Sequence, residues 1–132
     1  LVGSEMCIRD SAGTELILHL LEKPDVAACC SVLSQSSVML AQALQQCGKA
    51  GRIFAVGSDV FAENMTALQD KVLNNLVQKN PYAQGYLGIK TLVEYLVQGK
   101  APEQNTIYVG SEVVFRSNAV MYDSGNFRGL LI

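Results

Sequence analysis

The sequence predicts an α/β fold with a mainly parallel sheet flanked by helices. Short apolar runs alternate with segments of helical period along the whole chain, the pattern of crossover units that are right-handed in parallel sheets. The apolar run Val26–Val32 is continuous rather than alternating, which is typical of a strand covered on both faces. The chain has 49% apolar and 17% charged residues, the composition of a globular domain that can bury a core.

The N-terminal part predicts a helix, a strand and a second helix. The first helix covers Thr14–Glu22, with Thr14 as its cap and Pro24 just beyond its end. The strand Val26–Val32 follows. Ser36 and Ser37 are then expected to cap a helix that runs to Gln46, with Gly48 as the residue that terminates it.

The remaining chain predicts further strands and helices in alternation. A strand over 53–56 leads into a Gly-Ser-Asp turn, a short helix over 62–70 and a strand over 71–78. Asn80-Pro81 breaks the chain before the longest helical pattern, Tyr82–Gln98. One or two β-branched strands are expected over 106–115.

Composition and motifs exclude several classes of function for this stretch of chain. The formal net charge is −2 with Lys and Arg scattered singly, unlike the basic stripe of a nucleic-acid-binding surface. No apolar run approaches the ~20 residues that span a bilayer. Neither a phosphate-binding loop nor a hydrolase motif is present, and the lone His19 lies mid-helix among Leu and Ile, so we expect no catalysis. No C-x-x-C spacing suggests a metal, and we expect no cofactor.

Ligands of parallel α/β sheets bind beyond the carboxyl ends of the strands, so the residues that follow each strand are the candidate site. These positions supply a carboxylate, an amide, two hydroxyls and two aromatic rings. Such groups together suit a small polyhydroxylated ligand such as a sugar, because carboxylates and amides bind hydroxyls while ring faces pack on C–H groups. The candidate residues are Asp59, Gln78, Ser36, Ser37, Phe61 and Tyr82.

Three motifs resemble those of one family. They are V-G-x-D after a strand, Q-x-N-P-Y-x-x-G opening a helix, and a Gly-Lys-x-Pro turn, followed by VVFRSNAVMY. Over Thr14–Tyr122 the chain resembles the C-terminal part of the type I periplasmic-binding fold. That fold is shared by sugar-binding proteins of ABC transporters and by effector domains of lactose-repressor-family regulators.

The resemblance implies roles for the same residues. It places ligand hydroxyls on Asp59 and Gln78, with Ser36-Ser37 at the position of a polar pair that opens the preceding helix. It also implies that the N-terminal lobe is missing, and that the helix Tyr82–Gln98 would pack on that lobe. We therefore expect this helix to expose Leu87, Leu92, Val93 and Leu96.

Two biological settings remain open for this bacterial-type fragment. In a regulator, the protein would be cytoplasmic and homodimeric and would bind operator DNA only through a missing N-terminal domain. In a transport protein, it would be periplasmic or lipid-anchored outside the cell and would meet a membrane permease. Unpaired thiols at Cys29, Cys30 and Cys47 and the repressor-like ending VxRSN favour the regulator.

The first residues fit nothing that follows them. Met6–Asp10 translate one reading frame of the transposon end used to fragment DNA for sequencing. We therefore expect residues 1–11 to be an adapter-derived scar, 12–123 to be the C-terminal lobe with its final crossover helix, and 124–132 to be a tail.

Overall fold

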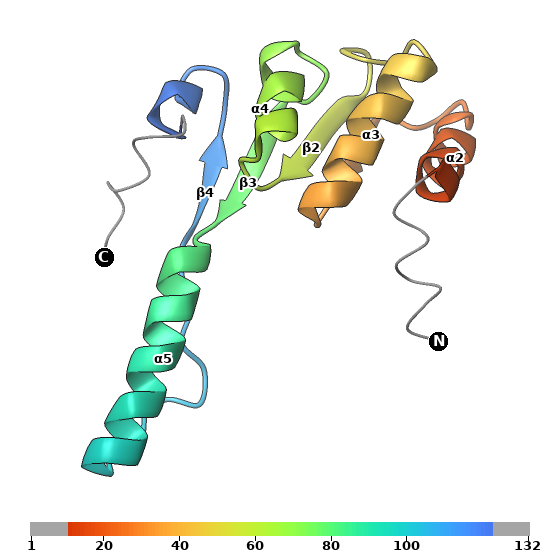
Figure 1. The fold of residues 1–132 in the computed structure, drawn as a ribbon. Helices are drawn as coiled ribbons and strands as arrows, with labels where there is room; N and C mark the ends of the chain where they lie inside the picture. Colours follow the sequence, from red (N-terminus) through yellow and green to blue (C-terminus); the bar gives the residue numbers. More distant parts are fainter. Residues whose placement is uncertain (1–10, 123–132) are drawn as a thin grey trace.

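A computed structural model describes residues 11–122 of the chain (Figure 1). The expected scar 1–11, apart from Ser11, and the tail 124–132 lie outside the described residues. The elements are α2 (Ser11–Leu21), β1 (Ala28–Cys30), α3 (Ser34–Gln46), β2 (Phe54–Ser58), α4 (Ala62–Gln69), β3 (Asn75–Lys79), α5 (Pro81–Gln98), β4 (Ser111–Val114) and a 3-10 turn (Ala119–Tyr122).

The described strands form one sheet in the order β1-β2-β3-β4. β1 pairs with β2, and β2 with β3, in parallel, whereas β3 and β4 are antiparallel with Leu76 opposite Val114. The prediction of an α/β fold with a mainly parallel sheet is confirmed. The antiparallel edge arises because the chain leaves the sheet along α5 and returns beside it in the opposite sense (Figure 1).

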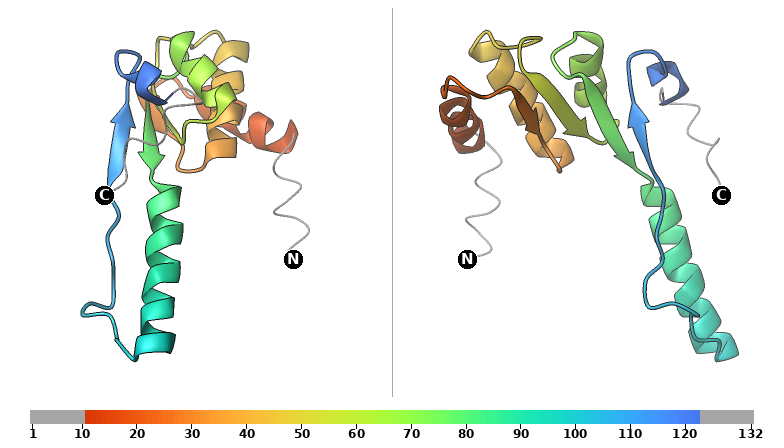
Figure 2. Two further views of the ribbon diagram at one scale, coloured as in Figure 1. Left: turned by 60° about the vertical axis from the view of Figure 1, so that its left-hand side comes forward. Right: turned by 180° about the vertical axis from the view of Figure 1, so that it is seen from behind.

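The helices α3 and α4 cover one face of the sheet, and α2 packs against α3 (Figure 2). Leu44 of α3, Leu68 of α4 and Leu76 of β3 are fully buried between these layers. Residue 57 must be a glycine for Leu76 to pack this closely on β2, since a Cβ at this position would lie 2.7 Å from a methyl carbon of Leu76. The core of the molecule is therefore the layer between the sheet and the helices α3 and α4.

The opposite face of the sheet is open in the described part of the chain. Phe54 and Val113, which point to that face, are 53% and 44% exposed. In β1, Ala28 and Cys30 are exposed and only Cys29 is partly buried. The expectation that the strand within Val26–Val32 is covered on both faces is therefore wrong for the described residues, because no helix among them packs on that side.

Helix α5 extends beyond the sheet, and the segment 99–110 returns along it (Figures 1 and 2). None of its residues is buried. Leu92, Val93 and Leu96 are 51%, 48% and 70% exposed, while Leu87 is partly buried. The predicted exposure is confirmed for Leu92, Val93 and Leu96, and it is wrong for Leu87, which lies in a cavity between this helix and the segment that leads into β4.

Several predicted boundaries are corrected. Helix α2 begins at Ser11, so Thr14 lies inside it and does not cap it. Helix α3 begins at Ser34 after Leu33, and its N-terminus has no side-chain cap, so the caps predicted at Ser36 and Ser37 are wrong. Strand β3 begins at Asn75, because Lys71 has a φ of 62° and the preceding residues form a turn.

Candidate functional site

Predicted ligand residues from two neighbouring strand ends meet in one cavity, which we call the strand-end pocket. Its volume is about 670 Å³, and Asp59, Phe61 and Gln78 line it. They come together because β2 and β3 are parallel and end at the same edge of the sheet. The other lining residues are Ser34, Val60, Ala62, Met65, Lys79, Pro81, Gln84 and Tyr122.

Asp59 lies directly after β2 in a left-handed conformation, with a φ of 65°. Its backbone N–H donates to the carbonyl oxygen of Val77 at 2.9 Å, which fixes the turn against β3. One carboxylate oxygen lies 3.3 Å from the Nζ of Lys79. The other oxygen is in no ion pair with a residue of the described range 11–122, and it can accept hydrogen bonds from ligand hydroxyls.

Gln78 is buried at the end of β3, with 7% of its surface exposed. Its Oε1 accepts a hydrogen bond from the backbone N–H of Val60 at 3.1 Å. This bond leaves the Nε2 group as the end of the side chain that can donate to a ligand. Asp59 and Gln78 therefore offer complementary chemistry, an acceptor and a donor, in the same pocket.

Phe61 adds an apolar surface at the mouth of the pocket. It precedes α4 directly and is 58% exposed. An exposed ring beside hydroxyl-binding groups can pack on the C–H face of a sugar.

Ser36 and Ser37 do not line the strand-end pocket. Ser37 is fully buried, and its Oγ donates to the carbonyl oxygen of Leu33 at 2.8 Å and accepts from the N–H of Ser58 at 2.8 Å. The Oγ of Ser36 lies 2.8 Å from that of Ser31. Both hydroxyls hold α3 and its preceding loop in place, and their contact with a ligand stays a prediction.

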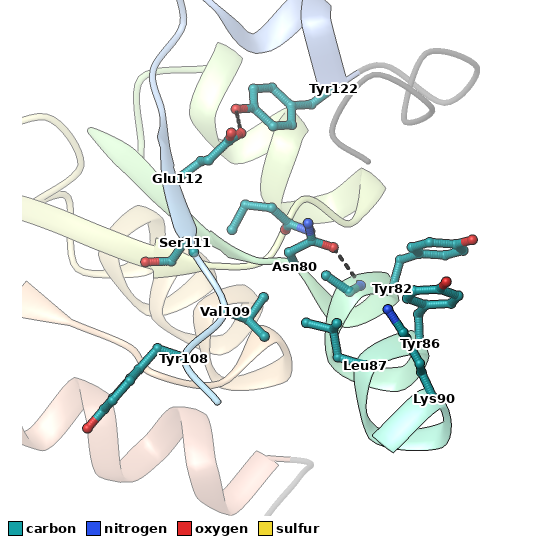
Figure 3. Close-up of a pocket in the computed structure, with 13 residues that line it drawn as sticks. Asn80, Tyr82, Tyr86, Leu87, Lys90, Tyr108, Val109, Ser111, Glu112 and Tyr122 are labelled. Atoms are coloured by element: carbon teal, nitrogen blue, oxygen red, sulfur yellow. Dashed lines mark hydrogen bonds between the residues drawn. The ribbon is translucent and has the colours of Figure 1, made fainter. Parts of the chain in front are cut away.

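Tyr82 lies in a neighbouring cavity of about 440 Å³, between the start of α5 and the segment that leads into β4 (Figure 3). Its ring stacks on Tyr86 with centroids 6.3 Å apart. Gln78 and Tyr122 line both cavities. The hydroxyl of Tyr122 donates to Glu112, and burial, followed by that bond and the carboxylate charge, raises the pKa of Tyr122 to about 12.

Sequence reasoning missed Lys79, Met65, Gln84 and Tyr122 as lining residues. Lys79 follows Gln78 directly and was the most accessible to inference, because a cation next to an Asp on the adjacent strand end forms an ion pair. The other three come from helices or from a distant segment, and a single strand-end motif does not indicate them.

Within residues 11–122, no cysteine or histidine lines the strand-end pocket. Cys29 has a pKa raised by burial and by the neighbouring Cys30, the opposite of what an activated nucleophile needs. His19 lies 3.5 Å from Glu22, and both side chains are largely exposed. No cluster of metal-binding side chains occurs within residues 11–122, and no helix there could cross a membrane.

The fold is an α/β domain with a cavity at the carboxyl ends of two parallel strands, and it can be compared with known families. The family described as periplasmic binding protein domain matches residues 10–101, more than half of the chain. The chain belongs to this family. No curated protein sequence matches it.

Solved structures of sugar-binding proteins share the fold. GanP, a glucose-galactose binding protein from Geobacillus stearothermophilus, is 22% identical with a TM-score of 0.72, over 80% of this chain and 37% of that one. An ABC transporter solute-binding protein from Agrobacterium vitis with bound D-fucose is 23% identical with a TM-score of 0.73, over 86% of this chain and 38% of that one. A LacI-type transcriptional regulator from Bacteroides fragilis is 27% identical with a TM-score of 0.65, over 81% of this chain and 36% of that one.

The chain therefore spans well under half the length of each of these structures. The prediction of a partial periplasmic-binding-protein fold is confirmed.

Proposed function

We propose that this chain forms part of a sugar-binding module and that the strand-end pocket contributes one side of its ligand cleft. The observation that carries the proposal is the convergence of Asp59 and Gln78 with Phe61 in one cavity at the carboxyl ends of β2 and β3. A carboxylate oxygen, an amide donor and an exposed ring match the hydroxyls and C–H faces of a monosaccharide. The sugars bound by proteins of the same fold support this ligand class.

The role we propose is binding without catalysis. The family and the solved structures of this fold are binding proteins and a regulator. Ser36, Ser37 and Tyr82 are proposed as assisting residues from positions next to the pocket.

We further propose that the other side of the cleft comes from a second lobe of a longer protein. Two observations support this proposal. The chain corresponds to little more than a third of the sugar-binding structures that share its fold. Helix α5, which begins at the edge of the pocket, exposes Leu92, Val93 and Leu96. We expect the 132-residue chain alone to bind sugars poorly, because half of the contacts would be absent.

The test is the substitution Asp59→Ala in the full-length protein that contains this chain. Loss of the carboxylate should weaken binding of a sugar such as D-galactose or D-fucose by roughly 1.5 to 3 kcal/mol, the scale of a hydrogen bond to a charged group. Isothermal titration calorimetry measures this change. Asp70→Ala is the matched control, because Asp70 is an exposed carboxylate at the far end of α4. Equal affinity in the two variants would remove Asp59 from the site.

The finer proposal is that the module is the effector domain of a cytoplasmic, homodimeric transcription regulator of the lactose-repressor family. Cys29, Cys30 and Cys47 are free thiols, which suits a reducing compartment. In this setting, ligand binding would change the affinity of an upstream DNA-binding domain for operator DNA.

The alternative is the substrate-binding protein of an ABC sugar transporter, which would deliver its ligand to a membrane permease. The ABC solute-binding protein among the structures of this fold favours this reading. A long sequencing read across the codons for Ser4–Gly13 decides between them. A helix-turn-helix upstream would establish the regulator, and a signal peptide or lipid-attachment cysteine would establish the transport protein.

A further inference from the structure

We infer that Asn64 is a positioning residue for ligand recognition, which holds Asp59 and the loop before α3 in the geometry that the strand-end pocket needs. The inference rests on the proposed sugar-binding function. Asn64 lies in the first turn of α4 and is fully buried. It does not line the pocket, so it would act through its neighbours rather than by touching the ligand.

The side-chain amide of Asn64 joins two separate segments of the pocket wall. Its Nδ2 donates to the carbonyl oxygens of Ser58 at 2.9 Å and Asp59 at 3.2 Å, at the end of β2. The same nitrogen lies 3.3 Å from the carbonyl oxygen of Ser34, at the start of α3. Since Ser34 and Asp59 both line the pocket, one buried group fixes their backbone positions relative to each other.

Asp59 needs this support because of its backbone conformation. A residue other than glycine is disfavoured at a φ of 65°, and it keeps that conformation only where its surroundings hold it. The N–H of Asp59 is held by Val77 and its carbonyl oxygen by Asn64. With both backbone groups held, the direction in which the Asp59 side chain leaves the backbone is set before a ligand arrives, which lowers the entropy cost of binding.

The orientation of the Asn64 amide is set by the carbonyl groups around its nitrogen. Its Oδ1 is buried and has no hydrogen-bond partner among the described residues. Exchanging the two amide atoms would set the oxygen against three carbonyl oxygens, so the orientation is determined by its surroundings. The donor end of the amide therefore serves the two segments of the pocket wall.

The triplet Asn64-Met65-Thr66 has the form of a glycosylation sequon. In this structure its polar side chains instead make hydrogen bonds within the fold. The amide nitrogen is buried and donates to backbone carbonyl groups, and the hydroxyl of Thr66 donates to Ala62 at 2.9 Å. The folded protein therefore does not present this amide at its surface.

The experiment compares Asn64→Ser with the matched control Asn74→Ser in the full-length protein. Asn74 also holds a backbone group, accepting from the N–H of Ala55 at 2.7 Å, but it lies just before β3, at the opposite end of the sheet from the pocket. Binding of D-galactose and D-fucose is measured by calorimetry on folded protein. We expect Asn64→Ser to weaken binding about tenfold and Asn74→Ser to change it less than about twofold.

A double variant separates positioning from general destabilisation. If Asn64 acts through Asp59, then adding Asn64→Ser to Asp59→Ala should cause less than about twofold further loss, because the group it positions is already gone. Equal effects of Asn64→Ser and Asn74→Ser, or full additivity with Asp59→Ala, would overturn the inference. Failure of the unmodified protein to bind any sugar would instead overturn the proposed function.

If Asn64→Ser does not fold, hydrogen exchange of the Asn64 side-chain amide in the unmodified protein provides the test. Slow exchange in the sugar-free protein as well as in the complex supports a preformed geometry. Exchange in the sugar-free protein as fast as that of exposed side-chain amides would contradict it.

Discussion

Helices α3 and α5 both follow a parallel strand and both carry apolar residues at helical spacing, yet they differ in what holds them. Helix α3 buries six residues between the sheet and the neighbouring helices α2 and α4, and it has no side-chain cap at its N-terminus. Helix α5 buries none, but Asn80 caps it by accepting from Ala83 at 3.0 Å, Pro81 opens it and Gly99 ends it in the left-handed conformation. Helix α3 is stabilised mainly by packing, whereas α5 is stabilised by its capping residues. Strong sequence signals for a helix therefore do not show which surface of the protein the helix packs against.

The largest contrast should come from truncating a leucine in each helix of the 132-residue chain. Leu44 of α3 is fully buried, whereas Leu96 of α5 is 70% exposed. We expect Leu44→Ala to lower the free energy of unfolding by about 2 to 5 kcal/mol through lost burial and a cavity, and Leu96→Ala by less than about 0.5 kcal/mol. Urea denaturation followed by circular dichroism measures both. Similar losses would mean that α5 is packed as firmly as α3.

Replacing a glycine beneath α3 and a glycine in α5 by alanine should change stability in opposite directions. A Cβ at Gly57 would meet Leu76 at 2.7 Å and Leu73 at 3.0 Å beneath α3, whereas one at Gly88 in α5 would meet nothing within 4 Å. We expect Gly57→Ala to destabilise the chain by about 1 to 3 kcal/mol through overpacking. Gly88→Ala should stabilise it by up to about 1 kcal/mol, because alanine favours the helix. Thermal unfolding of the two variants measures whether each change raises or lowers the stability of the chain. A stabilising effect of Gly57→Ala would contradict the tight packing described around Gly57 beneath α3.

The smallest effect on stability is expected for charges on the exposed face of α5. The double change Leu92→Lys with Leu96→Lys should alter the free energy of unfolding of the isolated chain by less than about 0.5 kcal/mol. It should also reduce the fluorescence of a dye that binds apolar surfaces. In the full-length protein the same change should be strongly destabilising if a second lobe covers this helix. Unchanged stability of the full-length protein would show that the face stays exposed there.

Much of the fold and part of the site could be predicted from the sequence, for a physical reason. Parallel strands end at one edge of a sheet, so residues that follow β2 and β3 had to lie near each other. This rule placed Asp59, Phe61 and Gln78 in one region, and the strand-end pocket contains all three. The existence of the helices also followed, because apolar spacing, Pro and Gly are local signals.

The remaining features depend on contacts between distant segments. Ser37 resembles a helix cap in sequence, but Ser58 approaches it from β2 and fixes its hydroxyl inside the core. Nothing near Asn64 in the sequence indicates that Ser34 would reach its amide. Tyr82 follows the same strand end as Gln78, yet the direction of α5 carries its ring into the adjoining cavity. These arrangements are set by how α3, α4 and α5 pack or extend, which spacing alone does not encode.

The antiparallel pairing of β3 with β4 has a consequence for the order of folding. β1, β2 and β3 can assemble in sequence through short crossovers, but β4 pairs only after the long excursion over 80–110 has closed. Closing this loop costs conformational entropy before β4 makes any contact with the sheet. Helix α5 buries no residue, so it contributes little packing energy to offset that entropy. We therefore expect β4 to join the sheet last. Val114, which β4 places in the core, would then report the final step of folding in kinetic experiments.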